Sequence, residues 1–382
     1  MKNSREFDAI IVGARAAGAA TAMLLARRGL RVLALERAQY GSDTLSTHAL
    51  MRPAVLQLHR WGLLDRVRAA GTPPVRRVTF RYPDENVVVD LPPSDGVDAL
   101  FAPRRTVLDR ILVDAARESG ARVAFGIAVE SLQRDSAGRV TGVLARDASG
   151  HSFSLRAQIV IGADGIRSIV ARQAGAEVTR SSKVEGAVLF GYFAGAETSG
   201  YEWGYSPGMS AGFIPTNNGE VCVFVGCATS RFRDEVQPDL HRGFHGILER
   251  VSPDMARRIA FARQTGHFRG FASTSGFYRR AFGPGWALVG DAGLFRDPIT
   301  THGITDAFRD AELLARAIAG IHSLEHYQTT RDAVSRPVFD VTERIAAYDW
   351  NMDEIRLHLR EVSRAMKPEL RLLLGWDAAA AA

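Results

Sequence analysis

The stretch AIIVGARAAGAATAMLLARRGLRVLALE, residues 9–36, decides the fold. Its apolar β-branched run ends at Gly13, and a second glycine, Gly18, opens a helix of small residues that runs to Gly29. A second apolar strand then ends on an acid, Glu36. Strand, glycine turn, helix, strand and acid in this order are typical of the βαβ unit that binds dinucleotides, so the stretch predicts a dinucleotide-binding domain.

Each part of this unit has a physical role. Gly13 permits the tight turn, and Gly18 lets the helix lie close to the sheet. The first turn of the helix, around Ala17, presents free N–H groups and a positive dipole end to a pyrophosphate. Glu36, which Arg37 follows, is placed to accept hydrogen bonds from a ribose. We expect these five residues to contact the dinucleotide.

The middle glycine of the GxGxxG pattern is replaced by Arg15. A Cβ at this position crowds the pyrophosphate, but a guanidinium beside a diphosphate partly offsets that crowding. We therefore include Arg15 among the cofactor-binding residues. The alternative interpretation of the whole stretch is a buried helix with a glycine cap and no ligand.

Length and composition describe an ordinary globular protein with room for two domains. The 382 residues are 46% hydrophobic and 24% charged, and no apolar stretch reaches the roughly eighteen residues of a membrane span. The short segment MKNSREFDA before the first strand leaves no room for a signal peptide. We therefore expect a cytoplasmic protein, either a monomer or a homodimer.

Charge and cysteine usage exclude several classes of partner. The net charge of +6 comes from arginines that are scattered among acids, whereas a nucleic-acid surface has clustered basic residues. Cys222 and Cys227 form neither a disulfide framework nor a metal-binding pattern. We expect them to be small apolar fillers on one strand, and we predict no metal site.

Hydrophobic periodicity gives a coarse map of the remaining elements. We expect helices at 53–64, 106–119 and 303–320, a β-hairpin at 76–90, strands at about 122–134, 138–147, 153–161 and 286–290, a β-rich region at 183–230 and a helical tail at 333–375.

Two later segments repeat the pattern of an apolar strand that ends in glycine and aspartate. They read QIVIGADGIRS at 158–168 and WALVGDAGLFRDPITTHGI at 286–304. Each places an aspartate, Asp164 or Asp291, at the carboxyl edge of a strand, where open α/β sheets bind ligands. One such segment is equally consistent with an ordinary turn, but three in one chain are hard to explain as turns.

The order of these motifs resembles the single-component FAD-dependent aromatic hydroxylases, the p-hydroxybenzoate hydroxylase-like flavoprotein monooxygenases. It also resembles their geranylgeranyl reductase-like and halogenase-like relatives. The resemblance covers nearly the whole chain and rests on four motifs: Gly13–Gly18 with Glu36, the DG motif at Gly162–Ser168, the GD motif at Gly290–Pro298, and RxxLxxxL at Arg105, Leu108 and Leu112.

The resemblance implies an α/β fold: a Rossmann-like FAD-binding domain of the glutathione reductase type, an inserted β-sheet-rich substrate domain and a helical C-terminus. The expected parts are the FAD-binding domain at 1–71, 100–180 and 282–330, a substrate-domain hairpin at 72–99, the β-rich substrate domain at 181–281 and C-terminal helices at 331–382.

The resemblance also implies further FAD contacts. Arg105 is expected near the diphosphate, Arg52 along the cofactor, Val129 at the adenine and Asp291 at a ribityl hydroxyl, and Asp164 is expected to bind the cofactor or guide NAD(P)H. The helix that begins at Gly303 would point its N-terminus at the flavin, which adds three contacts: Thr301, Gly303 and Ile304.

Two reactions compete within this resemblance. In the first, NAD(P)H reduces the flavin and O2 forms a C4a-hydroperoxide, which hydroxylates or epoxidises a small, aromatic or polyketide-like substrate. In the second, reduced flavin saturates a double bond, as in the geranylgeranyl reductases. The spelling GDAGLFRDPITTHGI, with Leu294, Thr301 and Thr305 in place of the hydroxylases' histidine, glycine and asparagine, lies nearer the reductase and halogenase branch.

Halogenation and a non-enzymatic flavin-binding role are weaker alternatives. The WxWxIP motif of halogenases is absent, since YEWGYSPG has one tryptophan, and the only lysines are Lys2, Lys183 and Lys367. We therefore predict a flavoprotein monooxygenase of secondary metabolism, with FAD as cofactor and NAD(P)H as co-substrate.

The substrate is expected between the flavin edge and the inner face of the β-rich region. The candidate contacts are the aromatic residues and proline on its strands: Tyr192, Trp203, Tyr205, Phe213 and Pro215. Such side chains are more often simple core. Two histidines are candidate catalytic groups, His302 in the loop beside Gly303 and His48 in LSTHALM, because imidazole can polarise a flavin oxygen or a substrate hydroxyl. His302 can equally be interpreted as a loop histidine bonded to backbone, and for His48 that structural interpretation is the stronger one.

Overall fold

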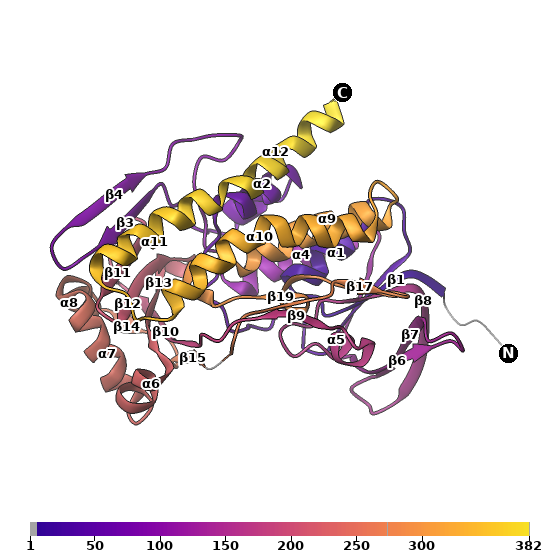
Figure 1. The fold of residues 1–382 in the computed structure, drawn as a ribbon, viewed down its shortest axis with the longest axis horizontal. Helices are drawn as coiled ribbons and strands as arrows, with labels where there is room; N and C mark the ends of the chain where they lie inside the picture. Colours follow the sequence, from indigo (N-terminus) through magenta and orange to yellow (C-terminus); the bar gives the residue numbers. More distant parts are fainter. Residues whose placement is uncertain (1–5, 273, 382) are drawn as a thin grey trace.

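The computed structural model describes residues 6–272 and 274–381, and the side chains of 7–272 and 274–376. Residues 1–5, on which the expectation of a missing signal peptide partly rests, lie outside the described residues. The described chain has an α/β architecture with three sheets and a helical C-terminal part, as the sequence predicts. Figure 1 shows the two large sheets toward opposite ends of the molecule, with the last helices lying across both.

The first large sheet contains the predicted βαβ unit. Its strands β1, β2, β5, β8 and β18 pair in parallel, and β17 pairs antiparallel at one edge. In spatial order the path is β17 (Phe282–Gly283), β18 (Trp286–Leu288), β8 (Ser152–Gly162), β1 (Glu6–Val12), β2 (Val32–Glu36) and β5 (Arg122–Phe125), with β6 (Ala128–Arg134) paired to β7 (Val140–Arg146) and β7 to the first half of β8.

Both faces of this sheet are covered, which is why its strands are continuously apolar. On one face Ala9 and Ile11 belong to the core formed with the three helices α1 (Ala16–Ala26), α4 (Arg105–Glu118) and α9 (Gly303–Ile318). On the other face Ile10 and Val12 belong to a second core with β7 and α5 (Ile169–Ala174). The alternation of side chains along β1 thus anchors both layers.

The second large sheet is built from the β-rich region. Its path is β14 (Arg263–Gln264), β10 (Gly186–Ala194), β13 (Glu220–Ala228), β12 (Met209–Pro215), β11 (Tyr201–Ser206), β3 (Arg77–Arg81) and β4 (Asn86–Asp90), with β15 (Arg269–Ala272) paired to β10. The predicted hairpin is confirmed as β3 and β4, and β3 joins β11 in parallel. Helices α7 (Leu240–Val251) and α8 (Pro253–Ala260) cover one face of this sheet.

The remaining elements connect and cover these sheets. They are α2 (Arg52–Arg60), α3 (Leu64–Ala69), β9 (Val178–Ser181), η1 (Asn217–Gly219), α6 (Thr229–Arg231), η2 (Phe232–Val236), β16 (Phe277–Arg279), η3 (Gly290–Ala292), β19 (Leu294–Phe295), η4 (Pro298–Thr300), α10 (Leu324–Ala346), α11 (Met352–Ala365) and α12 (Lys367–Ala381). Strands β19, β16 and β9 form the small third sheet.

One predicted element is wrong in its extent. The strand expected at 122–134 is two strands, β5 and β6, which pair with different neighbours. Between them Gly126 has φ +71°, a left-handed conformation that a continuous strand does not contain. The chain therefore turns there, and β6 leaves the line of β5.

The structure tests the expectations about the cysteines and about membrane-spanning segments. Cys222 and Cys227 are both buried free thiols on β13, which confirms that they are fillers on one strand. Among the described residues, no helix combines the length and apolarity that crossing a bilayer requires.

Candidate cofactor and substrate site

The ends of three parallel strands bring the three predicted motifs together. Val12 of β1 and Leu288 of β18 both pair with Gly162 of β8. Beyond the strands, the Ala163 N–H donates to the Val12 carbonyl at 2.8 Å and the Val289 N–H donates to the Gly162 carbonyl at 2.9 Å. The GARAAG, GADG and GDAG segments therefore begin side by side at one sheet edge.

Glycines allow these segments to touch. A Cβ on Gly18 would lie 1.9 Å from the Gly13 carbonyl oxygen, and a Cβ on Gly13, which has φ +96°, would lie 2.5 Å from the Ala163 carbonyl oxygen. A Cβ on Gly290 would come within 3.0 Å of the Ala17 side chain. Side chains at these positions would push the three segments apart, so the glycines are required by the close approach itself.

Two helix N-termini open at this edge, where α1 and α9 pack against each other. Within the described chain, no hydrogen bond occupies the backbone N–H groups of Ala16 and Ala17 in α1 or of Gly303 and Ile304 in α9. Gly303 is exposed, although nearly all of α9 behind it is buried. Free donors and positive dipole ends at the partly exposed Ala17 and the exposed Gly303 suit an anionic ligand such as a diphosphate.

Glu36 is fixed at the end of β2. Its two carboxylate oxygens accept hydrogen bonds from the backbone N–H groups of Ala14 and Ala38, each at 2.9 Å. Each oxygen keeps a lone pair for a ribose hydroxyl. Arg37 is the next residue and is exposed. The Ile127 N–H, just before β6, donates to the Glu36 carbonyl at 3.0 Å, and Val129 is the second residue of β6. Glu36 and Val129 thus lie on neighbouring segments of the chain.

Arg15 lies at the first turn of α1, among polar groups. Its guanidinium donates to Asp109 at 3.3 Å and to the Ser42 carbonyl at 3.1 Å. Asp109 also accepts two hydrogen bonds from Arg105 at the start of α4. The sequence-predicted pair Arg15 and Arg105 therefore shares one carboxylate, which holds both cations beside the α1 N-terminus.

The two motif aspartates have different surroundings. Burial raises the pKa of Asp291 to about 7, with the Asp306 carboxylate adding to the shift, and its Oδ1 lies within 4.0 Å of a Cβ built on Gly303. Burial also raises the pKa of Asp164, but its oxygens already accept from Ser168 and Ile169 at the start of α5. Asp291 is thus the acid with capacity for a ligand, and Asp164 chiefly shapes the DG turn.

Arg52 is not brought into this group. Its guanidinium donates to the carbonyls of Val97 and Pro92, so it fastens the 92–97 loop to the start of α2. Thr301 does border the site: it has φ +56°, follows η4 and precedes α9 by two residues.

His48 and Tyr192, predicted separately, are in contact. Their rings are nearly parallel, and His48 Nε2 lies 3.1 Å from Tyr192 Oη. The Arg104 guanidinium lies 3.5 Å from the centre of the Tyr192 ring, a cation–π contact that the sequence did not suggest. Burial lowers the pKa of His48 to about 3, assisted by Arg104 and Arg105. The imidazole is therefore neutral near pH 7.

His302 lies beneath the start of α9. It is 1% exposed, and its Nδ1 hydrogen-bonds the Thr300 carbonyl. Burial lowers its pKa to about 4, with Arg296 as the next cause. His302 is not among the residues that line the narrow pocket between the second sheet and the loop before α9. It is packed directly before α9, where it supports the start of that helix.

Five buried charged side chains form an ionic cluster in and around α9, which we call the α9 cluster: Arg296, Asp306, Arg309, Asp310 and Glu369. Arg309 donates to Asp306, to Asp310 and to Glu369 of α12, and Arg296 also donates to Asp306. The cluster ties the helix whose N-terminus opens at the site to the C-terminal part of the chain.

The buried neutral state of His302 predicts a pH effect on stability. Its pKa is about 6.5 when unfolded and about 4 when folded, so the unfolded state binds more protons and stability falls as the pH drops below about 6.5. We expect His302→Asn to remove this loss: relative to the variant, the wild type should lose about 2 kcal/mol between about pH 7.5 and pH 5. Urea unfolding of both proteins at the two pH values measures it, and parallel pH profiles would contradict it.

A narrow pocket lies between the second sheet and the loop that leads into α9. Its wall is mostly apolar and includes Val188, Phe224, Phe271 and Ile299. Its polar wall residues are Thr47, Asp297, Thr301 and Tyr348. Because Thr301 lines it, the pocket adjoins the start of α9 and hence the place where the flavin is expected.

None of the five predicted substrate contacts lines this pocket. Trp203 and Tyr205 lie on the same sheet face as Phe224, and Trp203 contacts that ring at 5.8 Å. The expectation that Phe213 and Pro215 lie on this inner face is wrong. Phe213 is packed in the core with α7 and α8, and Pro215 pairs directly with Val221 of that same core.

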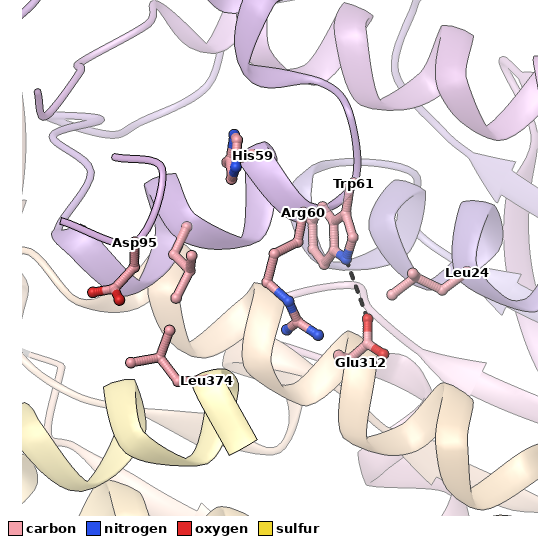
Figure 2. A pocket seen from close by; sticks show the side chains of 8 residues that line it. Leu24, His59, Arg60, Trp61, Asp95, Glu312 and Leu374 are labelled. Atoms are coloured by element: carbon pink, nitrogen blue, oxygen red, sulfur yellow. Dashed lines mark hydrogen bonds between the residues drawn. The ribbon is translucent and has the colours of Figure 1, made fainter. Parts of the chain in front are cut away.

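A wider hollow lies elsewhere, between α2, α9 and α12 (Figure 2). In its wall the Trp61 indole N–H donates to Glu312 at 3.1 Å, and Glu312 also accepts from Arg28 and Arg316. It includes none of the sequence-predicted site residues, and its central acid is already satisfied. Within the described part of the chain, no cluster of three or more His, Cys, Asp or Glu side chains could hold a metal ion.

Several site residues escaped the sequence analysis. Asp297 stands in the GDAGLFRDP motif, so its position was visible but its exposure to a pocket was not. Phe224 lies on β13, which is apolar and buried on both faces, so the sequence could not say which of its side chains face the pocket. Arg104, Phe271 and Tyr348 carry no local signal, because they reach the site only through tertiary contacts.

Comparisons with known proteins agree with this geometry. A family model described as FAD binding domain matches residues 6–342. The chain is 29% identical over 339 residues to a menaquinone reductase of Mycolicibacterium smegmatis, covering 81% of the chain and 75% of that protein. It is 27% identical over 337 residues to a digeranylgeranylglycerophospholipid reductase of Methanocella arvoryzae, covering 82% and 78%.

Among solved structures, the flavin-dependent brominase Bmp2 superposes with a TM-score of 0.81 at 18% identity, covering 98% of this chain and 100% of that one. At this identity the likeness concerns the fold.

Proposed function

Because this chain belongs to the FAD binding domain family of flavin-dependent oxidoreductases, we propose that it is a monooxygenase. Its electrons would come from NAD(P)H, and it would insert one oxygen atom of O2 into a small, aromatic or polyketide-like substrate by hydroxylation or epoxidation. FAD, when bound, supplies the electron transfer from NAD(P)H to O2. The protein's share is to bind the cofactor, orient the substrate and exclude water.

The residues at the sheet edge fit FAD. The free N–H groups of α1, with Arg15 and Arg105 beside them, suit the diphosphate, and Glu36 suits the adenosine ribose. The N-terminus of α9 would favour negative charge on the flavin. Asp291 stands beside that N-terminus and can accept a hydrogen bond from a ribityl hydroxyl.

The observation that carries the reaction is the narrow, mostly apolar pocket beside Thr301. Phe224 and Phe271 in its wall suit a flat substrate, and an apolar wall excludes the bulk water that wastes an activated oxygen. His48, neutral and bonded to Tyr192, follows the pocket residue Thr47. It can orient the phenol of Tyr192 without adding charge.

The second candidate function is reduction of an isoprenoid-type double bond. The relatives named menaquinone reductase and digeranylgeranylglycerophospholipid reductase favour it.

Isotopically labelled O2 separates these functions. Purified holoprotein, NAD(P)H and a panel of aromatic and polyketide-like compounds should give substrate-stimulated NAD(P)H oxidation and a product that carries one labelled oxygen atom. An unlabelled product with a saturated double bond, formed equally well without O2, would establish the reductase instead. Addition of bromide or chloride tests halogenation. Of the two lysines whose side chains are described, Lys183 and Lys367, neither lines the pocket, and both are exposed.

A further inference from the structure

The second large sheet ends in an exposed strand, β4, at the periphery of the molecule (Figure 1). Every residue of β4 is exposed, and Val87, Val88 and Val89 keep 38%, 52% and 40% of their surface. In the described chain, no other exposed large apolar side chains stand next to one another in the sequence. An open strand edge of this kind is a template on which another strand can pair.

The hydrogen bonds of the β3–β4 hairpin show which backbone groups of β4 are free. At its two ends, the Tyr82 N–H donates to the Glu85 carbonyl and the Leu91 N–H donates to the Arg76 carbonyl, both at 2.8 Å. Bonded and non-bonded pairs alternate along an antiparallel ladder, and the register between these ends has no irregularity. The odd-numbered residues of β4 therefore bond to β3. The N–H and C=O groups that point away from the sheet, which we call the β4 edge, belong to Asn86, Val88 and Asp90.

Ion pairs hold both ends of β4. In the turn before it, Asp84 and Glu85 both pair with Arg356 of α11. At the other end, Asp90 pairs with Arg77 of β3 at 2.8 Å. Within the described chain, no hydrogen bond occupies the β4 edge itself. The edge is thus presented by a fixed hairpin, so a strand that pairs with it costs little backbone freedom of β4.

The sequence of β4, NVVVD, is complementary to itself in antiparallel pairing. With a two-fold axis at Val88, this residue forms a hydrogen-bonded pair with its own copy, and Asn86 forms one with the partner's Asp90. The Asn86 amide can then donate to the carboxylate of the partner's Asp90. Apolar side chains meet on both faces, since Val88 lies beside its copy and Val87 beside the partner's Val89.

We propose that the β4 edge is a dimerisation surface, on which a second copy of this chain pairs antiparallel about a two-fold axis at Val88. A second copy is favoured over a different protein because one strand supplies both members of every complementary pair. Each copy offers one β4 edge, so the contact closes as a dimer and does not propagate into a filament. The second sheets of the two copies would become one continuous sheet. A single strand pair is a small interface, and small interfaces are weak and transient.

Engineered cysteines test the register on the full-length, FAD-loaded protein. In the proposed dimer the Cα atoms of residue 88 in the two copies lie about 5.5 Å apart, a distance that a disulfide spans. Val88→Cys should therefore form a covalent dimer with oxidised glutathione, visible on a non-reducing gel. Val87→Cys is the matched control: it is also exposed, but it faces the partner's Val89 and is offset from its own copy, beyond the reach of a disulfide. The native Cys222 and Cys227 are buried.

Sedimentation equilibrium tests the backbone hydrogen bonds. We expect the wild type to be dimeric at about 100 µM and monomeric at about 1 µM, as for a weak interface. Val88→Pro removes an outward N–H and no bond to β3, a change that edge strands tolerate. The dissociation constant of the dimer should rise at least about tenfold, while FAD stays bound. Val88→Thr, which keeps the N–H and the branched shape, should dimerise like the wild type.

Exchanging the polar pair gives a check that does not depend on proline. Asn86→Asp places like charges opposite each other on both sides of the two-fold axis, so the dissociation constant should rise about tenfold at low salt. Adding Asp90→Asn restores an amide opposite a carboxylate, and the value should return to within about threefold of the wild type.

Four outcomes would overturn the dimerisation surface. They are a wild type that stays monomeric at about 100 µM, equal cross-linking of Val87→Cys and Val88→Cys, unchanged dimerisation of Val88→Pro, and a double variant as weak as Asn86→Asp alone.

Discussion

Replacing Gly18 with alanine is expected to abolish FAD binding. The added Cβ would lie 1.9 Å from the Gly13 carbonyl oxygen and 3.1 Å from the Ala163 side chain. Both neighbours belong to the packed sheet edge, and the nearest is backbone that no side-chain rotation can move away. The helix α1 would therefore shift, and its free N–H groups would leave the position that suits a diphosphate.

Titration of apoprotein with FAD measures this effect. We expect the dissociation constant to rise at least about a hundredfold, equivalent to about 2.7 kcal/mol, so the purified variant should be colourless. Gly246→Ala is the matched control: Gly246 lies in α7 with no atom within 4 Å of the added Cβ. It should bind FAD normally and gain up to about 1 kcal/mol of helix stability. Wild-type affinity in Gly18→Ala would refute the close approach of α1.

Arg309→Met should give the largest loss of stability among single substitutions in the α9 cluster. Arg309 is 1% exposed and donates to Asp306, Asp310 and Glu369. Removing it leaves three buried carboxyls without their common cation, and stranding buried charge in this way costs about 3–5 kcal/mol. Urea unfolding monitored by tryptophan fluorescence measures the change in the free energy of unfolding.

Arg66→Met provides the comparison for an exposed pair. Arg66 and Glu118 form a salt bridge with 44% and 55% of their side chains exposed, and such pairs contribute at most about 1 kcal/mol. A loss below about 1 kcal/mol for Arg309→Met would show that water reaches the α9 cluster and that its charges are solvated.

The dinucleotide-binding unit was predictable because its signals are local. Gly13 and Gly18 indicate where the chain must turn and where α1 must lie close to the sheet, and Glu36 indicates the end of the next strand. The GD and DG segments carry the same kind of signal. Within one βαβ unit, the residues that determine the turn, the close packing and the strand end are near one another in the sequence. Their spacing therefore predicted their positions in the structure.

The substrate pocket was not predictable to the same degree. Both faces of β12 are buried, since Phe213 belongs to the core with α7 and α8 while Ile214 belongs to the larger core. Alternation of apolar residues therefore could not say which face borders the site. Tyr348 lies between α10 and α11, and Arg104 is the residue before α4. Only tertiary packing brings these two side chains to the site.

The parallel order of β18, β8 and β1 also constrains how the chain folds. These neighbours come from residues 286–288, 152–162 and 6–12, so the sheet edge forms only after two long loops have closed. Pairings of such sequence separation are slow to form, because their entropy is lost before their contacts are gained. This sheet edge is thus a late product of folding, and FAD added during refolding should capture only chains whose distant segments have already met.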